Sequence, residues 1–166
     1  LDEINIFLQG RIDDLGCMAF DNPNHYVKPA IKYGFAASRY GLLGPTHWKW
    51  NVGIEKDIRY KKAWFNNEIS KSSIGFRRFA KNLFPEIPYF VATSYGGCFA
   101  IKKELILNYE KSFYIKLLNI LQKHKNPIEG HYMERLWCYL FTKNRLLSKA
   151  CNDVLLTKLE ISKKFI

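Results

Sequence analysis

Long apolar runs, paired cysteines and acidic residues are what this sequence has little of, and each shortage excludes a class of protein. No apolar run approaches the roughly 18–20 residues that a transmembrane helix needs, so no membrane span is expected. The four cysteines form no C-x-x-C pair, which argues against a zinc ribbon or a redox centre. Cys98 and Cys138 stand among apolar residues, so we expect small, buried and reduced thiols there.

The sequence does not begin with methionine, and we expect no signal peptide at its start. The chain starts with the acidic segment Leu1-Asp2-Glu3, and the apolar run at residues 4–8 is too short for the hydrophobic region of a signal peptide. Because the sequence enters a predicted core strand at once, we expect a fragment of a longer protein whose earlier part is absent. Because reduced thiols are typical of cytosolic proteins, we expect a cytoplasmic location.

Acidic residues are few: 15 Asp and Glu stand against 26 Lys and Arg, which leaves a formal net charge of +11. This excess favours anionic partners such as nucleic acid, anionic lipid or phosphorylated substrates, and it is equally typical of a lysine-rich surface without a partner. The basic residues are scattered, and no zinc-finger, helix-turn-helix or RNA-recognition pattern accompanies them. We therefore expect no specific nucleic-acid partner.

What the sequence does contain is typical of one globular α/β domain. Hydrophobic residues make up 48% and aromatic residues 16%, and no repeat or linker divides the chain, so residues 1–166 are expected to form a single domain. Buried strands are predicted at residues 4–8 and 98–101. Helices are predicted at residues 29–40, with Pro29 near the first turn, and at residues 74–84, 103–107, 111–124 and 127–143.

Three loops carry residues that suit ligand binding, and each also has a structural explanation. Asp13 and Asp14 follow the first predicted strand, where α/β sheets place ligands, and their carboxylates either bind Mg²⁺ or Mn²⁺ or cap turns. Trp48, in an irregular loop, either stacks on a sugar or base or anchors that loop to the core. Gly96 and Gly97 either let a ligand approach the backbone closely or form a plain tight turn.

The helix at residues 127–143 has the strongest apolar stripe, and its first turns carry the candidate catalytic groups. Glu129 lies near the helix N-terminus, where the dipole favours an ionised carboxylate, and is a candidate general base that His131 would assist. Glu134 and Arg135 point about 100° apart, so no direct pairing is expected between them, whereas Glu134 reaches His131 one turn back. The alternative is structural: Glu129 caps the helix, Glu134 pairs with an arginine elsewhere and Arg135 fixes a loop.

Four segments, in this order, resemble a family of uncharacterised proteins from bacteria and fungi that is itself similar to glycosyltransferases of the GT-A type. The segments are Ile6 to Gly10, with Phe-Leu-Gln-Gly; Tyr95 to Glu104, with Gly-Gly-x-Phe; Phe113-Tyr114; and Glu129 to Trp137, with Glu-Gly-His-x-x-Glu-Arg-x-Trp. The match runs from residue 4 to residue 141, and the last motif is the specific one.

This resemblance implies a nucleotide-sugar-dependent transferase with a GT-A-like mixed sheet flanked by helices, here lacking the N-terminal nucleotide-binding unit. By position, the loop from Gln9 to Asp14 would hold a divalent Mg or Mn ion against the diphosphate of the donor. Either Glu129 or Glu134 would be the base. The predicted metal ligands are Asp13 and Asp14, the predicted catalytic residues are Glu129, His131 and Glu134, and the predicted substrate-binding residues are Gln9, Trp48, Gly96, Gly97 and Arg135.

Two functions follow as hypotheses. The first is transfer of a sugar from a nucleotide-sugar donor to a hydroxyl of a surface glycan, as in polysaccharide biosynthesis. The alternative is a catalytically silent carbohydrate- or nucleotide-binding domain. The missing front half favours the alternative, as does the loop Arg11-Ile12-Asp13-Asp14-Leu15, which lacks the histidine of the family pattern. The sequence indicates no oligomeric state.

Overall fold

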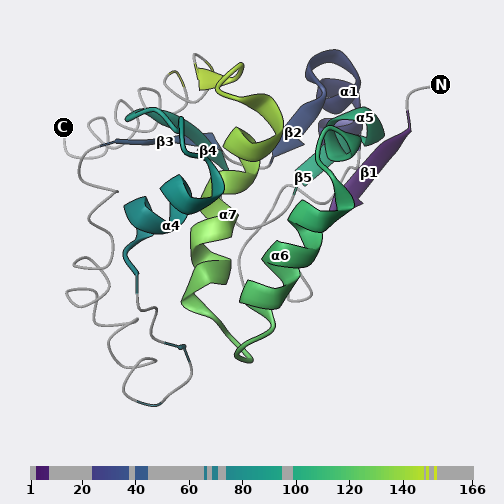
Figure 1. Cartoon of the computed structure of the whole chain (residues 1–166). Helices are drawn as coiled ribbons and strands as arrows, with labels where there is room; N and C mark the ends of the chain where they lie inside the picture. The colour runs from purple at the N-terminus through teal and green to yellow at the C-terminus, as the bar shows by residue number, and fades with distance from the viewer. Residues whose placement is uncertain are drawn as a thin grey trace. The chain divides into compact units, whose positions relative to one another are not determined.

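The computed structural model describes residues 3–7, 24–37, 40–44, 66, 69–70, 74–94, 99–147, 149 and 152 (Figure 1). Within them the helices are α1 (Asn24–Tyr33), α4 (Phe76–Leu83), α5 (Lys103–Leu107), α6 (Lys111–Leu121) and α7 (Ile128–Thr142). The strands are β1 (Ile4–Phe7), β2 (Phe35–Ala37), β3 (Tyr40–Leu43), β4 (Val91–Ser94) and β5 (Phe99–Lys102). The described part of the chain therefore combines helices with small sheets, which confirms a mixed α/β protein. None of the described helices is long and apolar enough to cross a membrane.

Residue contacts divide the chain into two compact units, each built from separate stretches of sequence. The first unit comprises Leu1–Leu42, Ala92–Tyr109 and Glu134–Ile166, and the second comprises Leu43–Val91 and Glu110–Met133. The first turns of α7 thus belong to the second unit, and the rest of that helix belongs to the first. A single domain over residues 1–166 stays a prediction.

The three-stranded sheet of the first unit has the order β1-β5-β2, and both neighbouring pairs are antiparallel. Side chains alternate across a sheet, so Ala36 and Ala100, which lie opposite each other, point to the same face. Tyr26 and Ala30 of α1 contact these alanines, whose small side chains let the helix lie close to the sheet. A second sheet pairs β3 with β4. The parallel pair that a mixed sheet requires stays a prediction.

Aromatic side chains occupy the other face of the three-stranded sheet. Phe35 and Phe99 stack with ring centroids 5.3 Å apart, and Phe141 of α7 lies 6.2 Å from Phe35 and 5.9 Å from Phe99. Trp137 completes the cluster at 5.9 Å from Phe99 and 6.0 Å from Phe141. Aromatic pairs at such separations contribute about 0.5–1.5 kcal/mol each beyond their buried area. The tryptophan of the Glu-Arg-x-Trp motif therefore helps to form the core.

The first strand is less buried than its apolar sequence predicts. Strand β1 forms at the expected place, but Ile6 is 43% exposed and Phe7 is 44% exposed. The prediction of a buried strand is wrong because β1 lies at one edge of the described three-stranded sheet, with β5 as its neighbour. The strand predicted at residues 98–101 is confirmed over its described residues as β5, which is buried between β1 and β2.

The core of the second unit joins α4 to the start of α7. Helical spacing places Phe76 and Phe79 on one face of α4, and both rings contact Tyr132, at centroid distances of 5.0 and 5.4 Å. Phe84, just after α4, lies 6.2 Å from Phe113 of α6. The helix predicted at residues 74–84 is confirmed as α4, which begins two residues later and ends one residue earlier, and its apolar face is the buried one.

The helix predicted at residues 29–40 is wrong in its bounds. Pro29 lies inside α1 rather than in its first turn, because the helix begins five residues earlier at Asn24. It ends at Tyr33, where Gly34 adopts a φ of +80° and donates its N–H to the Ala30 carbonyl at 2.7 Å. Strand β2 follows immediately. The helices predicted at 103–107, 111–124 and 127–143 are confirmed as α5, α6 and α7, although α6 ends three residues early.

Candidate functional site

Six of the predicted site residues lie outside the described residues: Gln9, Asp13, Asp14, Trp48, Gly96 and Gly97. The other four lie on α7, but they divide between the two units. Glu129 and His131 belong to the second unit, whereas Glu134 and Arg135 belong to the first. Each pair is therefore described within its own unit.

The first turn of α7 is fixed by a serine that is distant in sequence. The Ser70 hydroxyl accepts a hydrogen bond from the Ile128 N–H at 3.3 Å, and the Ser70 N–H donates to the Asn126 carbonyl at 3.1 Å. Ser70 thus satisfies one of the backbone donors that a helix N-terminus leaves open. This donor takes its partner from outside the helix, and the Glu129 carboxylate remains available for another role.

Glu129 lines a pocket of about 440 Å³ in the second unit. One wall comes from α4 with Phe79 and Asn82, and another comes from α6 and the turn after it. The residues that line this second wall are Lys116, Ile120 and Lys123. The volume falls within the range of about 300–1,000 Å³ that is typical of small-molecule sites. We call this cavity the Glu129 pocket.

The polar side chains that line the Glu129 pocket do not bind one another. Within the part of the chain that the structure describes, Asn82, Lys116, Lys123 and Glu129 make no side-chain hydrogen bond or ion pair. The pocket therefore combines two ammonium groups, one carboxylate and one amide with an apolar surface from Leu83 and Ile120. A few polar groups over an apolar floor are the usual composition of a ligand site.

The sequence analysis missed the other walls of this pocket. Lys116, Ile120 and Lys123 follow an i, i+4, i+7 spacing, which places them along one side of α6 and its continuation. That spacing was visible in the sequence, but nothing local indicates that this side faces Glu129. The position of Ser70 has no sequence signal either, because its partners lie more than fifty residues away.

His131 is not brought into the Glu129 pocket by its position on α7. It lies two residues after Glu129, which corresponds to about 200° around a helix, so the two side chains leave α7 on different sides. Its side chain is partly buried. Assistance of Glu129 by His131 stays a prediction, as does a contact between Glu134 and His131.

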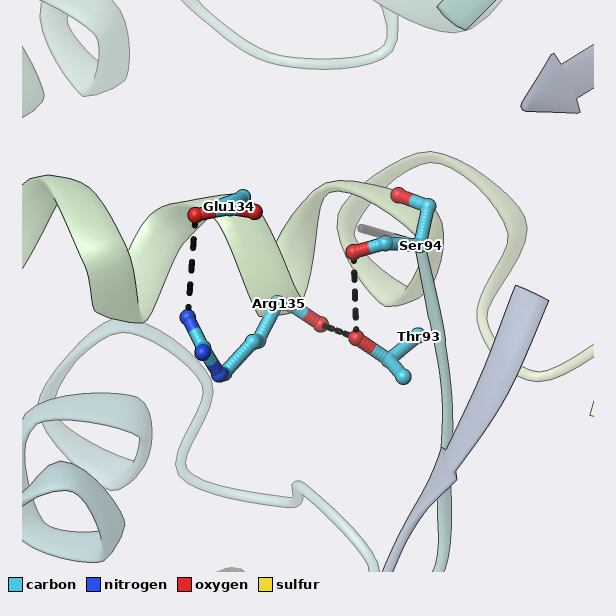
Figure 2. A network of polar contacts seen from close by, with 4 residues as sticks. All are labelled: Thr93, Ser94, Glu134 and Arg135. Atoms are coloured by element: carbon cyan, nitrogen blue, oxygen red, sulfur yellow. Dashed lines mark hydrogen bonds and ion pairs between the residues drawn. The ribbon is translucent and has the colours of Figure 1, made fainter. Parts of the chain in front are cut away.

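Glu134 and Arg135 pair with each other, so the prediction that they do not is wrong. Figure 2 shows the Arg135 guanidinium next to the Glu134 carboxylate, with Nη1 and Oε2 separated by 3.7 Å. Helical geometry separates the two Cβ directions, but the long arginine side chain bends back and closes the gap. Their side chains are 14% and 23% exposed for Arg135 and Glu134, respectively. The arginine that pairs with Glu134 is thus its neighbour rather than one elsewhere in the chain, and the structural and catalytic explanations of both residues stay predictions.

The backbone of Arg135 is also fixed to the end of β4. The Thr93 hydroxyl donates a hydrogen bond to the Arg135 carbonyl at 2.5 Å, and the Ser94 carbonyl lies 3.4 Å from the same hydroxyl (Figure 2). The Ser94 hydroxyl is buried and has no hydrogen-bond partner among the described residues. This network holds α7 against β4 within the first unit.

Cys138 is buried and is a free thiol, which confirms the prediction of a small, buried, hydrophobic side chain at this position. Burial raises the pKa of the Cys138 thiol to about 12, although the Thr142 hydroxyl and the charge of Lys149 act in the opposite direction. Such a thiol is protonated at neutral pH and is a poor nucleophile. We therefore assign no catalytic role to Cys138.

Metal binding finds no support among the described residues, where no group of three or more His, Cys, Asp or Glu side chains is arranged to hold an ion. The predicted ligands Asp13 and Asp14 lie outside these residues. A Mg²⁺ or Mn²⁺ site in that loop stays a prediction.

Comparison with known proteins gives one match. No curated protein and no solved structure is significantly similar to the chain. Residues 44–155 match the profile of a family described as protein of unknown function, DUF3431. That range includes the Glu129 pocket and the whole of α7. Because the match covers more than half of the sequence, the chain belongs to the DUF3431 family.

Proposed function

We propose that the protein is a GT-A-like glycosyltransferase that moves a sugar from a nucleotide-sugar donor to a hydroxyl of a surface glycan. One observation carries this proposal: the Glu129 carboxylate lines a pocket of about 440 Å³ and has no hydrogen-bond or ion-pair partner among the described residues. A general base must reach the proton that it removes, and it must be free of competing partners. Glu134 meets this second requirement less well because Arg135 pairs with it.

The proposed reaction is a displacement at the anomeric carbon of the donor sugar. Glu129 accepts the proton of the acceptor hydroxyl while the hydroxyl oxygen forms a bond to the anomeric carbon. The bond between that carbon and the phosphate oxygen of the nucleotide breaks, and the nucleotide leaves with the electron pair. Leu83 and Ile120, which are only partly buried, offer an apolar surface for a sugar ring, and the Asn82 amide offers both a donor and an acceptor for its hydroxyls.

The test is the turnover of Glu129→Gln, which keeps the shape of the side chain but removes its basicity. Release of UDP, GDP or CMP from a panel of sugar donors is measured in the presence of glycan acceptors. We expect Glu129→Gln to lower turnover by about 10²–10⁴-fold. Glu86→Gln is the matched control, because Glu86 is exposed in the turn after α4 and is not part of the pocket. Wild-type turnover in both Glu129→Gln and Glu134→Gln would reject the proposal.

Calorimetric titration with UDP, GDP and CMP, with and without Mn²⁺, separates the enzyme from the silent domain. Metal-dependent nucleotide binding together with turnover supports the transferase. Nucleotide or glycan binding without turnover of any donor would identify a silent binding domain instead. A cytoplasmic location, where the donor would be used, is part of the proposal and is tested by fractionation of cells that produce the protein.

A further inference from the structure

The charge of the Glu129 pocket is not balanced by the groups that line it. Lys116 and Lys123 supply two positive charges, and Glu129 supplies one negative charge. Both lysines lack an ion-pair partner within the described residues. An ammonium group that loses water on ligand binding needs an acceptor or an anion in exchange. A neutral ligand in this pocket would supply hydrogen-bond acceptors but no negative charge to the ammonium groups.

The two lysines belong to one wall of the pocket and are not a random part of the basic surface. Lys116, Ile120 and Lys123 are separated by four and three residues, so they follow one side of α6 into the turn after Leu121. The α4 wall has a similar spacing, with Phe79, Asn82 and Leu83 on one side of that helix. Lys111 and Lys125 lie on the same segment and are exposed, as are Lys116 and Lys123, but they do not line the pocket.

We propose that the acceptor in this pocket is an acidic sugar, whose carboxylate or phosphate is held by Lys116 and Lys123. This inference rests on the proposed function, in which Glu129 removes the proton from the acceptor hydroxyl. The acidic group accepts charge-assisted hydrogen bonds from the ammonium groups, which are roughly twice as strong as neutral ones. It also holds the sugar ring against Leu83 and Ile120 so that one hydroxyl faces Glu129.

Binding of simple probes tests the inference without the need for turnover. Glucuronate carries a carboxylate, glucose 6-phosphate carries a phosphate, and glucose carries neither. Their dissociation constants are measured by NMR titration on the whole protein. We expect at least one acidic sugar to bind about tenfold more tightly than glucose. Comparison of the two acids identifies which anionic group the lysines prefer.

Two matched double variants locate the binding. The double variant Lys116→Gln, Lys123→Gln is expected to raise the dissociation constant of the preferred acidic sugar about tenfold. The double variant Lys111→Gln, Lys125→Gln removes the same charge outside the pocket and is expected to change that constant less than about twofold. Glu129→Gln is expected to tighten binding of the acid, because it removes a like charge from the pocket. Equal loss in both double variants, or equal binding of glucose and the acids, would overturn the inference.

The inference and the proposed function can fail separately. If no acidic sugar is preferred but Glu129→Gln abolishes turnover, the acidic acceptor is wrong and the transferase stands. If the pocket lysines bind an acidic sugar but Glu129→Gln turns over at the wild-type rate, the transferase role of Glu129 is wrong and only an anion-binding pocket remains.

Discussion

Thr93 and Ser94 are neighbours at the end of β4, yet their hydroxyl groups have opposite energetic roles. Both side chains are buried, but only the Thr93 hydroxyl has an acceptor at short distance, the Arg135 carbonyl. A buried hydroxyl without a partner costs about 1–3 kcal/mol relative to one that is satisfied. The free energy of unfolding should therefore respond differently to removal of the two groups.

The first prediction compares Thr93→Val with Ser94→Ala. Thr93→Val keeps the shape and removes the donor, so it should lower the free energy of unfolding by about 0.5–1.5 kcal/mol. Ser94→Ala removes a hydroxyl without a partner among the described residues, so it should change stability by less than about 0.5 kcal/mol or increase it. Urea unfolding of the variants gives both values. A larger loss for Ser94→Ala than for Thr93→Val would show that Ser94 has a polar partner in the folded protein.

The second prediction concerns the alkaline pH dependence of stability. The pKa of Cys138 rises from an ordinary value of 9.0 to about 12 on burial, so the folded protein keeps this thiol proton while the unfolded chain loses it. The contribution is complete below pH 9 and is lost as the pH rises towards 12, with a slope of up to about 1.4 kcal/mol per pH unit. Cys138→Ala should remove this slope.

Urea unfolding of the wild type and of Cys138→Ala between pH 8 and about pH 11 measures the difference. Burial also raises the pKa of Tyr114, which lowers stability at alkaline pH as Cys138 does. Burial lowers the pKa of Lys143, which has the opposite effect on the pH dependence of stability. Both groups are present in the two proteins, so their effects cancel in the comparison. Parallel curves for the two proteins would mean that Cys138 is ionised as easily in the folded state as in the unfolded state.

At the scale of the element, Gly34 decides where α1 ends. Its φ of +80° lies in the region that residues with a side chain rarely adopt, and a Cβ there would lie 2.8 Å from Cδ1 of Leu105. The same residue links two elements, because its N–H bonds to Ala30 and its carbonyl accepts from the Lys102 N–H at 2.9 Å. Both the conformation and the available space therefore require glycine.

The third prediction follows from this position. Gly34→Ala should lower the free energy of unfolding by at least about 1–2 kcal/mol from the backbone alone, with a further cost for moving Leu105. Gly130→Ala is the control: it lies inside α7, where an added Cβ meets only Pro127 at an ordinary 3.7 Å. Alanine should stabilise that helix by about 0.5–1 kcal/mol. Thermal unfolding measures both variants, and equal melting temperatures for them would contradict the argument.

Local patterns in the sequence predicted where most helices lie, but they did not predict the bounds of α1 or the exposure of β1. The helical spacing of apolar residues predicted α4, α6 and α7 because the buried faces of these helices repeat at that spacing. The bounds of α1 were missed because proline is favoured in a first turn and disfavoured in a helix interior, where Pro29 in fact lies. The exposure of β1 was missed because an apolar strand does not reveal that it forms an edge. These errors concern tertiary position rather than local propensity.

In the candidate site, too, local sequence indicated individual residues but not the contacts that folding creates between them. The motif on α7 indicated Glu129 from its own residues, whereas the pocket needs side chains from α4 and α6, whose distance from Glu129 is set only by folding. The pairing of Glu134 with Arg135 depends on how a flexible side chain bends, which spacing does not encode. Six predicted residues lie outside the described part of the chain, so their roles stay predictions.

At the scale of the whole molecule, α7 serves two cores. Its first turns give Tyr132 to the aromatic cluster with Phe76 and Phe79 in the second unit. Its later turns give Phe141 to the cluster with Phe99 in the first unit. Each part of this 15-residue helix is shorter than the roughly 12–15 residues that an isolated helix needs to be marginally stable in water. Neither part is therefore expected to remain helical alone.

The last prediction is that the two units lose structure together when one end of α7 is weakened. Tyr132→Ala should lower the free energy of unfolding by about 3–5 kcal/mol, because Tyr132 is fully buried between two rings, whereas Tyr132→Phe keeps the ring and is the control. Hydrogen exchange is followed at the amides of α4 in the second unit and of β5 in the first. We expect Tyr132→Ala to accelerate exchange in both elements by similar factors, because α7 connects the two cores. Fast exchange in α4 with unchanged protection in β5 would show instead that the units unfold independently, and that the last turns of α7 are held by the first unit alone.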